Sequence, residues 1–88
     1  MSGAIDITII IPSAPYRNAE EILANLKKVT PKNRRIEVLI IKGTWPPLQR
    51  NVGIKQAKGK YIFFFDDDIV VPQGSMEQAL QTFEKNPH

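Results

Sequence analysis

Residues 61–68 have the sequence YIFFFDDD, in which five aromatic or aliphatic residues are followed directly by three carboxylates. The apolar half is typical of a strand in a protein core. Three adjacent negative charges repel one another, so their position after such a strand indicates a site for a cation or a polar ligand. Side chains alternate in an extended chain, which predicts Asp66 and Asp68 on one face, about 7 Å apart, and Asp67 on the other. Two carboxylates on one face suit a hard divalent ion.

Two further strands are predicted upstream of this segment. Residues 7–11 have the sequence ITIII, which is β-branched throughout and stops at Pro12, as expected for a strand covered on both faces. Residues 36–41, with the sequence IEVLII, follow a break at Pro31 and are predicted to form the second strand. Residues 61–65 then form the third.

A helix is predicted after each strand. From Ala19 the apolar residues recur at helical spacing, with glutamates in the first turn and lysines in the last, which matches the helix dipole. The second helix is predicted over residues 48–57, after two prolines that suit a helix start, and Gly59 stands where its C-cap is expected. The third helix begins near Ser75, which forms a capping-box pattern with Gln78.

This alternation of strands and helices predicts an α/β fold with a short parallel sheet, because parallel strands need a crossover between them. We expect a three-layer α/β/α arrangement of the Rossmann-like type. Ligands of such sheets bind beyond the carboxyl ends of the strands. Three segments are expected to meet at that edge, namely residues 13–17, 42–47 and 66–68.

Length and composition limit the classes of protein that are possible. A chain of 88 residues forms at most one domain, and its 42% hydrophobic and 24% charged residues are ordinary for a globular one. There is no cysteine, which excludes thiolate chemistry and fits a cytoplasmic location. The single histidine is His88, so serine–histidine and cysteine–histidine catalysis are not expected. No apolar run is long enough to span a membrane, and the N-terminus lacks the layout of a signal peptide.

The charge is distributed unevenly along the chain. Twelve Lys and Arg residues against nine Asp and Glu give a net charge of +3. Five of the cations crowd one connection: Lys27, Lys28, Lys32, Arg34 and Arg35. We interpret this connection mainly as a solvated turn, with phosphate or an anionic membrane surface as alternative partners. Basic residues are not interleaved with aromatic ones, so nucleic acid is not an expected partner.

Three segments together resemble the amino-terminal half of a family 2 glycosyltransferase with the GT-A fold. Residues 7–13 resemble its opening strand and the turn of proline and a polar residue that follows. Residues 49–59, QRNVGIKQAKG, resemble its arginine-asparagine-x-glycine helix, and residues 61–68 its strand ending in a D-x-D motif. The resemblance covers nearly the whole chain. It implies an inverting transferase that uses a nucleoside diphospho-sugar, most often a UDP-sugar.

The resemblance also implies roles for particular residues. Asp66 would contact the nucleoside, and Asp68, with Asp66 on the same face, would hold a Mg²⁺ or Mn²⁺ ion that bridges the two phosphates. Arg50 would approach the nucleotide, since a guanidinium can address a phosphate or a base carbonyl. Pro12 and Ser13 would shape a turn whose backbone meets the base. Asn51 and Gly53 are expected to serve packing rather than chemistry.

The sequence departs from the family pattern after the second predicted strand. The family usually carries an acidic pair there, with an aspartate that recognises the base, whereas residues 42–45 are KGTW. Three alternatives are open: Trp45 stacks on a base, Lys42 meets a phosphate, or nucleotide recognition has been lost.

A second departure concerns catalysis. The acceptor-binding half and the general base of the family follow the D-x-D segment, so no catalytic residue can be nominated here. We therefore expect residues 1–88 to be a single, truncated nucleotide-sugar-binding domain. Any peripheral membrane association would belong to the parent protein.

Two other classes of protein are alternatives. One is a non-catalytic α/β binding module, which would use the carboxyl edge of the sheet or the basic connection. The other is a phosphatase of the haloacid dehalogenase type, with Asp66 as the nucleophile and Asp68 as the acid–base. That motif normally stands on the first strand, however, and here two strand–helix units precede it.

Overall fold

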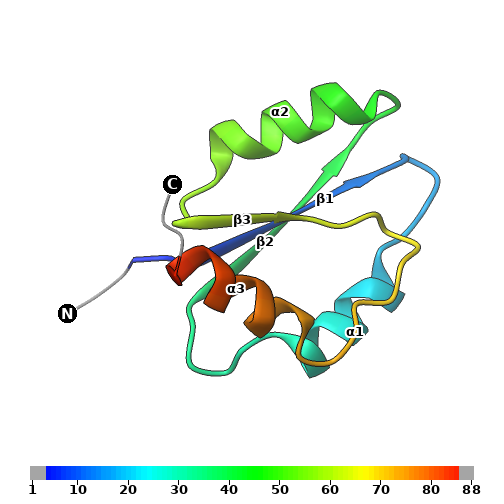
Figure 1. The fold of residues 1–88 in the computed structure, drawn as a ribbon. Helices are drawn as coiled ribbons and strands as arrows, with labels where there is room; N and C mark the ends of the chain where they lie inside the picture. Colours follow the sequence, from blue (N-terminus) through cyan, green and yellow to red (C-terminus); the bar gives the residue numbers. More distant parts are fainter. Residues whose placement is uncertain (1–3, 86–88) are drawn as a thin grey trace.

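The computed structural model describes residues 4–85, which form three strands and three helices in alternation (Figure 1). In chain order these are β1 (Ile7–Ser13), α1 (Glu20–Val29), β2 (Ile36–Lys42), α2 (Pro46–Gln56), β3 (Tyr61–Phe64) and α3 (Ser75–Lys85). The predicted α/β order is therefore confirmed. His88, on which the argument against histidine catalysis depended, lies outside the described residues.

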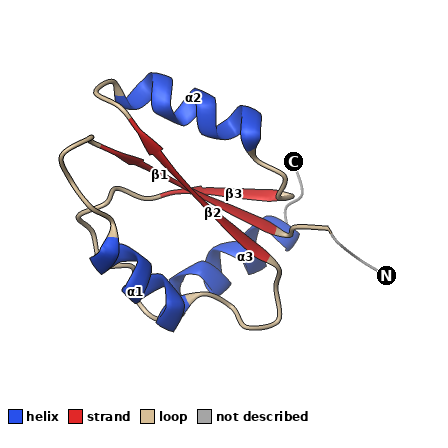
Figure 2. Ribbon diagram, turned by 180° about the vertical axis from the view of Figure 1, so that it is seen from behind, coloured by secondary structure: helices blue, strands red, loops and turns tan. Residues whose placement is uncertain are grey.

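The three strands form one parallel sheet in the order β2-β1-β3. In the register of this sheet Ile9 lies opposite Val38 on one side and Phe63 on the other. Helix α2 covers one face, and α1 and α3 cover the other (Figures 1 and 2). This is the predicted three-layer arrangement, with β1 at its centre because that strand alone is flanked on both edges.

The core lies between the sheet and helices α1 and α3. Ile7, Ile9 and Ile11 of β1 are fully buried on this face. Apolar side chains of the two helices pack against them: Ile22, Leu26, Val29, Met76 and Leu80. Burial of one such side chain contributes roughly 1.5–3 kcal/mol, so the isoleucines of β1 and the helix side chains packed on them together stabilise the fold.

The opposite face of the sheet is covered more thinly, by α2. A Cβ atom built on Gly53 would lie 2.6 Å from Cγ2 of Ile10, a distance that real Cβ atoms essentially never show. Gly53 thus lets the helix approach the sheet closely, which confirms the packing role predicted for it.

Two helix ends differ from the prediction. Helix α2 begins at Pro46 rather than residue 48, and it ends at Gln56 with Ala57 as an extended C-cap. Gly59 is therefore not a helix cap, and its φ is not in the left-handed region. Its amide instead donates to the Thr8 hydroxyl at 2.8 Å, so its position is set by the neighbouring strand.

The capping box predicted at the start of α3 is also absent. The Ser75 hydroxyl donates to the carbonyl oxygen of Pro72 at 2.8 Å, and the Gln78 amide donates to the carbonyl oxygen of Gly74. Gly74 has a φ of 83°, a conformation that side chains disfavour, and it turns the chain into the helix. The turn satisfies the groups that a capping box would have paired.

The Glu37 carboxylate joins β2 to β1 and to the end of α2. It accepts hydrogen bonds from the Thr8 hydroxyl at 2.6 Å and from the Lys58 amide at 2.7 Å. These two bonds, the hydroxyl first, favour the charged form and hold the pKa of Glu37 below its ordinary value of 4.5.

This depressed pKa makes stability depend on pH. Because the carboxylate is more acidic folded than unfolded, its contribution is complete above about pH 4.5 and is lost as the pH falls through the lower folded-state pKa. Glu37→Gln is expected to lower the free energy of unfolding by about 1 kcal/mol at pH 7, allowing for solvent screening. Urea titrations of both chains between pH 7 and 3 measure this difference, which should shrink below pH 4.5. A difference that is constant over this range contradicts the assignment.

None of the helices within residues 4–85 is both long and apolar enough to cross a membrane.

Candidate functional site at the carboxyl edge of the sheet

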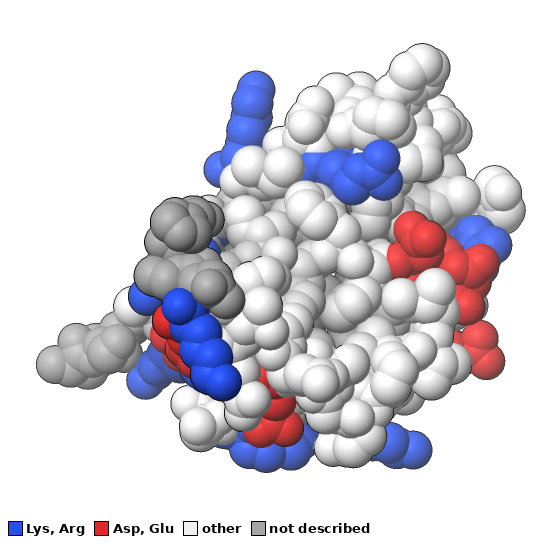
Figure 3. All heavy atoms as spheres, in the orientation of Figure 1, with Lys and Arg blue, Asp and Glu red and all other residues white. Residues whose placement is uncertain are grey.

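A cleft of about 350 Å³ opens at the carboxyl edge of the sheet. It is lined from three segments: Pro12, Ser13, Ala14, Tyr16 and Arg17 at the end of β1 and in the loop that follows; Gly43, Thr44, Pro46 and Gln49 around the start of α2; and Asp66, Asp67 and Asp68 after β3. The predicted convergence of three loops is therefore confirmed. In the space-filling view, acidic side chains gather at the edge where the β1–α1 and β3–α3 loops lie, with basic atoms beside them (Figure 3).

The three aspartates do not alternate as an extended strand would place them. Strand β3 ends at Phe64, and Asp67 and Asp68 lie in a turn. All three therefore line the same cleft, and the prediction that Asp67 faces away from it is wrong. Asp66 and Asp68 are exposed, whereas the Asp67 side chain is only 9% exposed.

Asp67 is held by two side chains of the β1–α1 segment. Its Oδ2 atom accepts a hydrogen bond from the Ser13 hydroxyl at 2.7 Å and forms an ion pair with Arg17 Nε at 3.2 Å. The middle carboxylate is thus engaged in joining β1 to the turn after β3. Asp66 and Asp68 flank it and are exposed to solvent.

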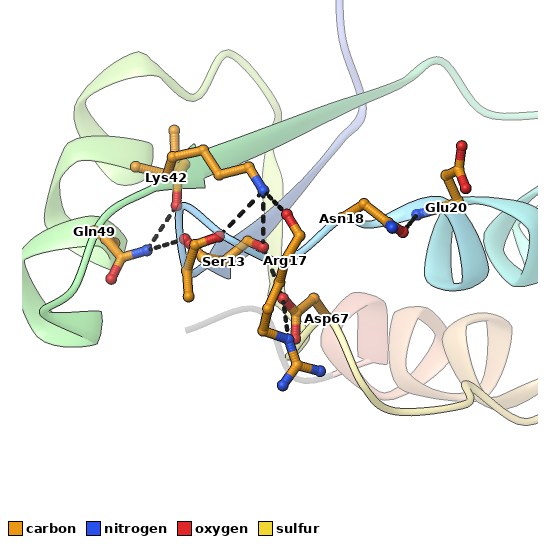
Figure 4. A network of polar contacts seen from close by, with 9 residues as sticks. Ser13, Arg17, Asn18, Glu20, Lys42, Gln49 and Asp67 are labelled. Carbon is orange, nitrogen blue, oxygen red and sulfur yellow. Dashed lines mark hydrogen bonds and ion pairs between the residues drawn. The ribbon is translucent and has the colours of Figure 1, made fainter.

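The ammonium group of Lys42, at the end of β2, belongs to the same network (Figure 4). It donates to the Ser13 hydroxyl at 3.3 Å, to the Ala14 carbonyl oxygen at 3.2 Å and to the Arg17 carbonyl oxygen. An ammonium carries three N–H donors, and all three have an acceptor here. Of the three alternatives for residues 42–45, a contact between Lys42 and a phosphate is therefore the one that this geometry does not favour.

Gln49 joins the ends of β1 and β2 from the first turn of α2. Its side-chain Nε2 donates to the carbonyl oxygens of Ser13, at 3.1 Å, and Ile41, at 2.7 Å, and the residue is 5% exposed. A Cβ atom on Gly43 would lie 2.9 Å from Cγ of Gln49, so the glycine makes room for this side chain. Gln49 was not predicted as a site residue, because a glutamine in a helix carries no sequence signal of such a contact.

The loop after the aspartates is fixed to α1. The Asn25 side-chain amide donates to the Val71 carbonyl oxygen at 3.2 Å, and its Oδ1 accepts the Val71 amide at 2.7 Å. Val71 itself is 3% exposed and packs in the core. The chain that carries Asp66 and Asp68 is therefore held at two points, at Asp67 between them and at Val71 farther along the loop.

The structure brings together four of the six residues predicted to bind a ligand or metal. Pro12, Ser13, Asp66 and Asp68 line the cleft. Trp45 and Arg50 do not: Trp45 is 66% exposed and lines a separate hollow beside α2, and Arg50 lies farther along that helix. Their contacts with a nucleotide stay predictions.

Arg17 lines the cleft but was not predicted individually as a site residue. Its side chain is 44% exposed although Nε is paired with Asp67. The residue counted only as part of a loop expected at this edge, and nothing in the sequence singles it out from the other arginines.

The donor set fits a divalent ion that shares its shell with a ligand. Among residues 4–85 no group of three or more His, Cys, Asp or Glu side chains is placed to hold a metal ion. The exposed carboxylates of Asp66 and Asp68 carry hard oxygen atoms of the kind that Mg²⁺ and Mn²⁺ accept as ligands. Such an ion is commonly held by one or two carboxylates together with phosphate oxygens and water.

Fold and cleft together define a Rossmann-like α/β domain with an acidic cleft at the carboxyl edge of its sheet. The model of one family, described as Glycosyl transferase family 2, matches residues 7–88. The chain belongs to this family. The match favours the transferase over the phosphatase alternative.

Curated relatives agree with this assignment. An "uncharacterized glycosyltransferase" of Rickettsia bellii (strain RML369-C) is 36% identical over 66 residues, which are 75% of this chain and 10% of that protein. A protein of the same description from Rickettsia felis (strain ATCC VR-1525 / URRWXCal2) is 36% identical over 64 residues, 73% of this chain and 11% of the relative. The chain thus spans about a tenth of the length of these relatives.

Proposed function

We propose that this domain binds a nucleoside diphospho-sugar together with Mg²⁺ or Mn²⁺. The observation that carries the proposal is the cleft, in which two exposed carboxylates flank a third that is held in place. Family membership supports it, because transferases of this family use activated sugars as donors. A UDP-sugar is the donor we favour.

Within this proposal the two exposed aspartates have different tasks. Asp66 contacts the nucleoside and shares the metal with Asp68, which is its main protein ligand. When bound, the ion neutralises the charge that develops on the leaving nucleoside diphosphate. Pro12 and Ser13 form the wall that meets the base, and Arg50 and Trp45 reach the nucleotide only with a change in side-chain position.

The transfer step is proposed for the whole protein, with inversion at the sugar carbon. No general base is assigned to residues of this chain, which spans a tenth of its relatives. A cytoplasmic location, and a peripheral membrane contact through the basic connection, are part of this proposal for the parent protein. The competing function is a non-catalytic binding module, which the presence of Lys42 after β2 favours.

A titration of the 88-residue chain with UDP tests the binding proposal. In the presence of Mg²⁺, the amide resonances of Asp66 and Asp68 are expected to shift at millimolar UDP, and in a parallel sample Mn²⁺ should broaden them selectively. UMP and GDP are the comparison ligands. UMP lacks the second phosphate and tests whether binding needs it, and GDP carries a different base and tests whether the base is recognised.

The outcomes distinguish the two functions. Shifts that need both the metal and the second phosphate support nucleotide-sugar binding. If neither UDP nor GDP with Mg²⁺ at several millimolar moves any of the cleft resonances, the nucleotide-binding proposal is wrong for this chain, and the binding module becomes the favoured function.

A further inference from the structure

We propose that Lys42 is a positioning residue that holds the aspartate turn in place from the far side of β1. This inference deepens the proposed function, and the effect of Lys42 on nucleotide affinity rests on that function. Lys42 lies at the end of β2, on the side of β1 opposite β3. Its influence on the turn after β3 must therefore pass through the β1–α1 segment.

The contacts of Lys42 all fall on that segment. Its Nζ donates to Ser13 Oγ at 3.3 Å and to the carbonyl oxygens of Ala14, at 3.2 Å, and Arg17. Two of these acceptors are main-chain carbonyls three residues apart, and the Arg17 amide itself donates to the Ala14 carbonyl oxygen at 3.1 Å, so the ammonium group reinforces a compact turn that the backbone already closes. The side chain acts here as a cation within the fold, with no N–H left for a ligand.

Two routes lead from this ammonium group to one oxygen of Asp67. The first passes through Ser13, whose hydroxyl accepts from Lys42 and donates its only hydrogen to Asp67 Oδ2 at 2.7 Å. The second passes through Arg17, whose carbonyl accepts from Lys42 and whose Nε meets the same Oδ2 at 3.2 Å. A donor at position 42 thus both orients the Ser13 hydroxyl and holds the main chain of Arg17, and both residues contact Asp67.

The identity of the residue matters because of what the acceptors require. The Arg17 carbonyl oxygen and the Ser13 hydroxyl oxygen accept from Lys42, which also adds a second donor at the Ala14 carbonyl oxygen. A long cationic side chain can supply three such donors from one position. An apolar side chain of the same length leaves these acceptors to water. The contacts of Ser13 and Arg17 with Asp67 are then weakened. Asp66 and Asp68, on either side of Asp67, are no longer held in one fixed orientation.

Binding of a metal–diphosphate unit depends on that orientation, because carboxylate ligands held by supporting groups bind more tightly than mobile ones. Lys42 would thereby raise the affinity for the nucleotide without touching it.

The test compares Lys42→Met with Lys42→Arg and with Lys55→Met, which makes the same change at an exposed lysine of α2. In the ligand-free chain, Lys42→Met is expected to shift the amide resonances of Asp66, Asp67 and Asp68, although their sequence positions are distant. Lys42→Arg should restore most of the wild-type positions, and Lys55→Met should leave them unchanged. If Lys42→Met does not fold, Lys42→Gln, which keeps a donor of shorter reach, takes its place.

The second measurement is the affinity for UDP with Mg²⁺. Lys42→Met is expected to weaken it about tenfold, as loss of a group that supports metal ligands does. Ser13→Ala should weaken it similarly, and the double variant should lose little more, because both act on Asp67.

The two failures are distinguishable. If the wild-type chain does not bind UDP, the proposed function fails, and the ligand-free resonances still decide the role of Lys42. Unchanged resonances of the aspartate turn in Lys42→Met overturn the inference, whatever the affinity.

Discussion

Gly59→Ala is expected to lower the free energy of unfolding by about 3 kcal/mol, the upper part of the range for overpacked cores. A Cβ atom at this position would lie 2.5 Å from the Thr8 nitrogen and 2.7 Å from the Ile7 carbonyl carbon. Both are main-chain atoms of the central strand, so a change of side-chain rotamer cannot relieve the clash. Loss of freedom in the unfolded chain favours alanine by only about 0.4–1 kcal/mol, which is too little to compensate.

Urea unfolding followed by circular dichroism measures this loss, with Gly74→Ala as the matched control. Gly74 has nothing within 4 Å of an added Cβ, but its φ is 83°. Its replacement should cost only the conformational penalty, about 1–2 kcal/mol. If Gly59→Ala is no more destabilising than Gly74→Ala, close contact with β1 is not the reason for the glycine.

Asp66→Asn and Asp68→Asn are expected to abolish metal-dependent binding of UDP. Each removes a negative charge and one anionic oxygen ligand from a site in which the protein supplies few. A loss of more than about 100-fold is expected, since even changes to groups behind metal ligands cost 10–100-fold. Calorimetric titration with UDP and Mn²⁺ measures it. Both residues are exposed, so the stability of the fold should change little.

Asp67→Asn provides the contrast for these two variants. Its carboxylate is held by Ser13 and Arg17, so the substitution should lower stability as well as affinity. An isolated exposed pair contributes about 0–1 kcal/mol, and the 9% exposure of the Asp67 side chain places the expected loss at the upper end of this range. Unchanged UDP affinity in both Asp66→Asn and Asp68→Asn would show that the D-x-D residues do not hold the metal.

Much of the fold was predictable because the strands differ chemically from everything around them. The β-branched run of residues 7–11 can be stable only where both its faces are covered, which requires neighbours on both edges and helices on both sides. Gly59 and Ser75 were misassigned for a common reason. The sequence patterns predict local helix caps, but the polar groups concerned can be paired equally well by other contacts. The hydrogen bond from the Gly59 amide to the Thr8 hydroxyl, from a distant segment, is an example.

The site was predictable to the level of which loops meet. Carboxyl ends of parallel strands share one edge, so residues 13, 43 and 66 were bound to approach each other once the topology was known. Which side chains point into the cleft was a different matter. Trp45 was nominated and lies outside the cleft, while Arg17 was not nominated and lies within it.

The sequence by itself determined the α/β class, the order of elements and the edge at which the three aspartates lie, because hydrophobic period and strand direction are local properties of the chain. Only the tertiary structure decided which of those aspartates is paired within the fold and which two are exposed. The Asp67 carboxylate accepts a hydrogen bond from the hydroxyl of Ser13, 54 residues away in the sequence. That hydroxyl accepts one from the ammonium group of Lys42, 29 residues away. Such contacts depend on the distance between loops after packing, and no spacing along the chain encodes that distance.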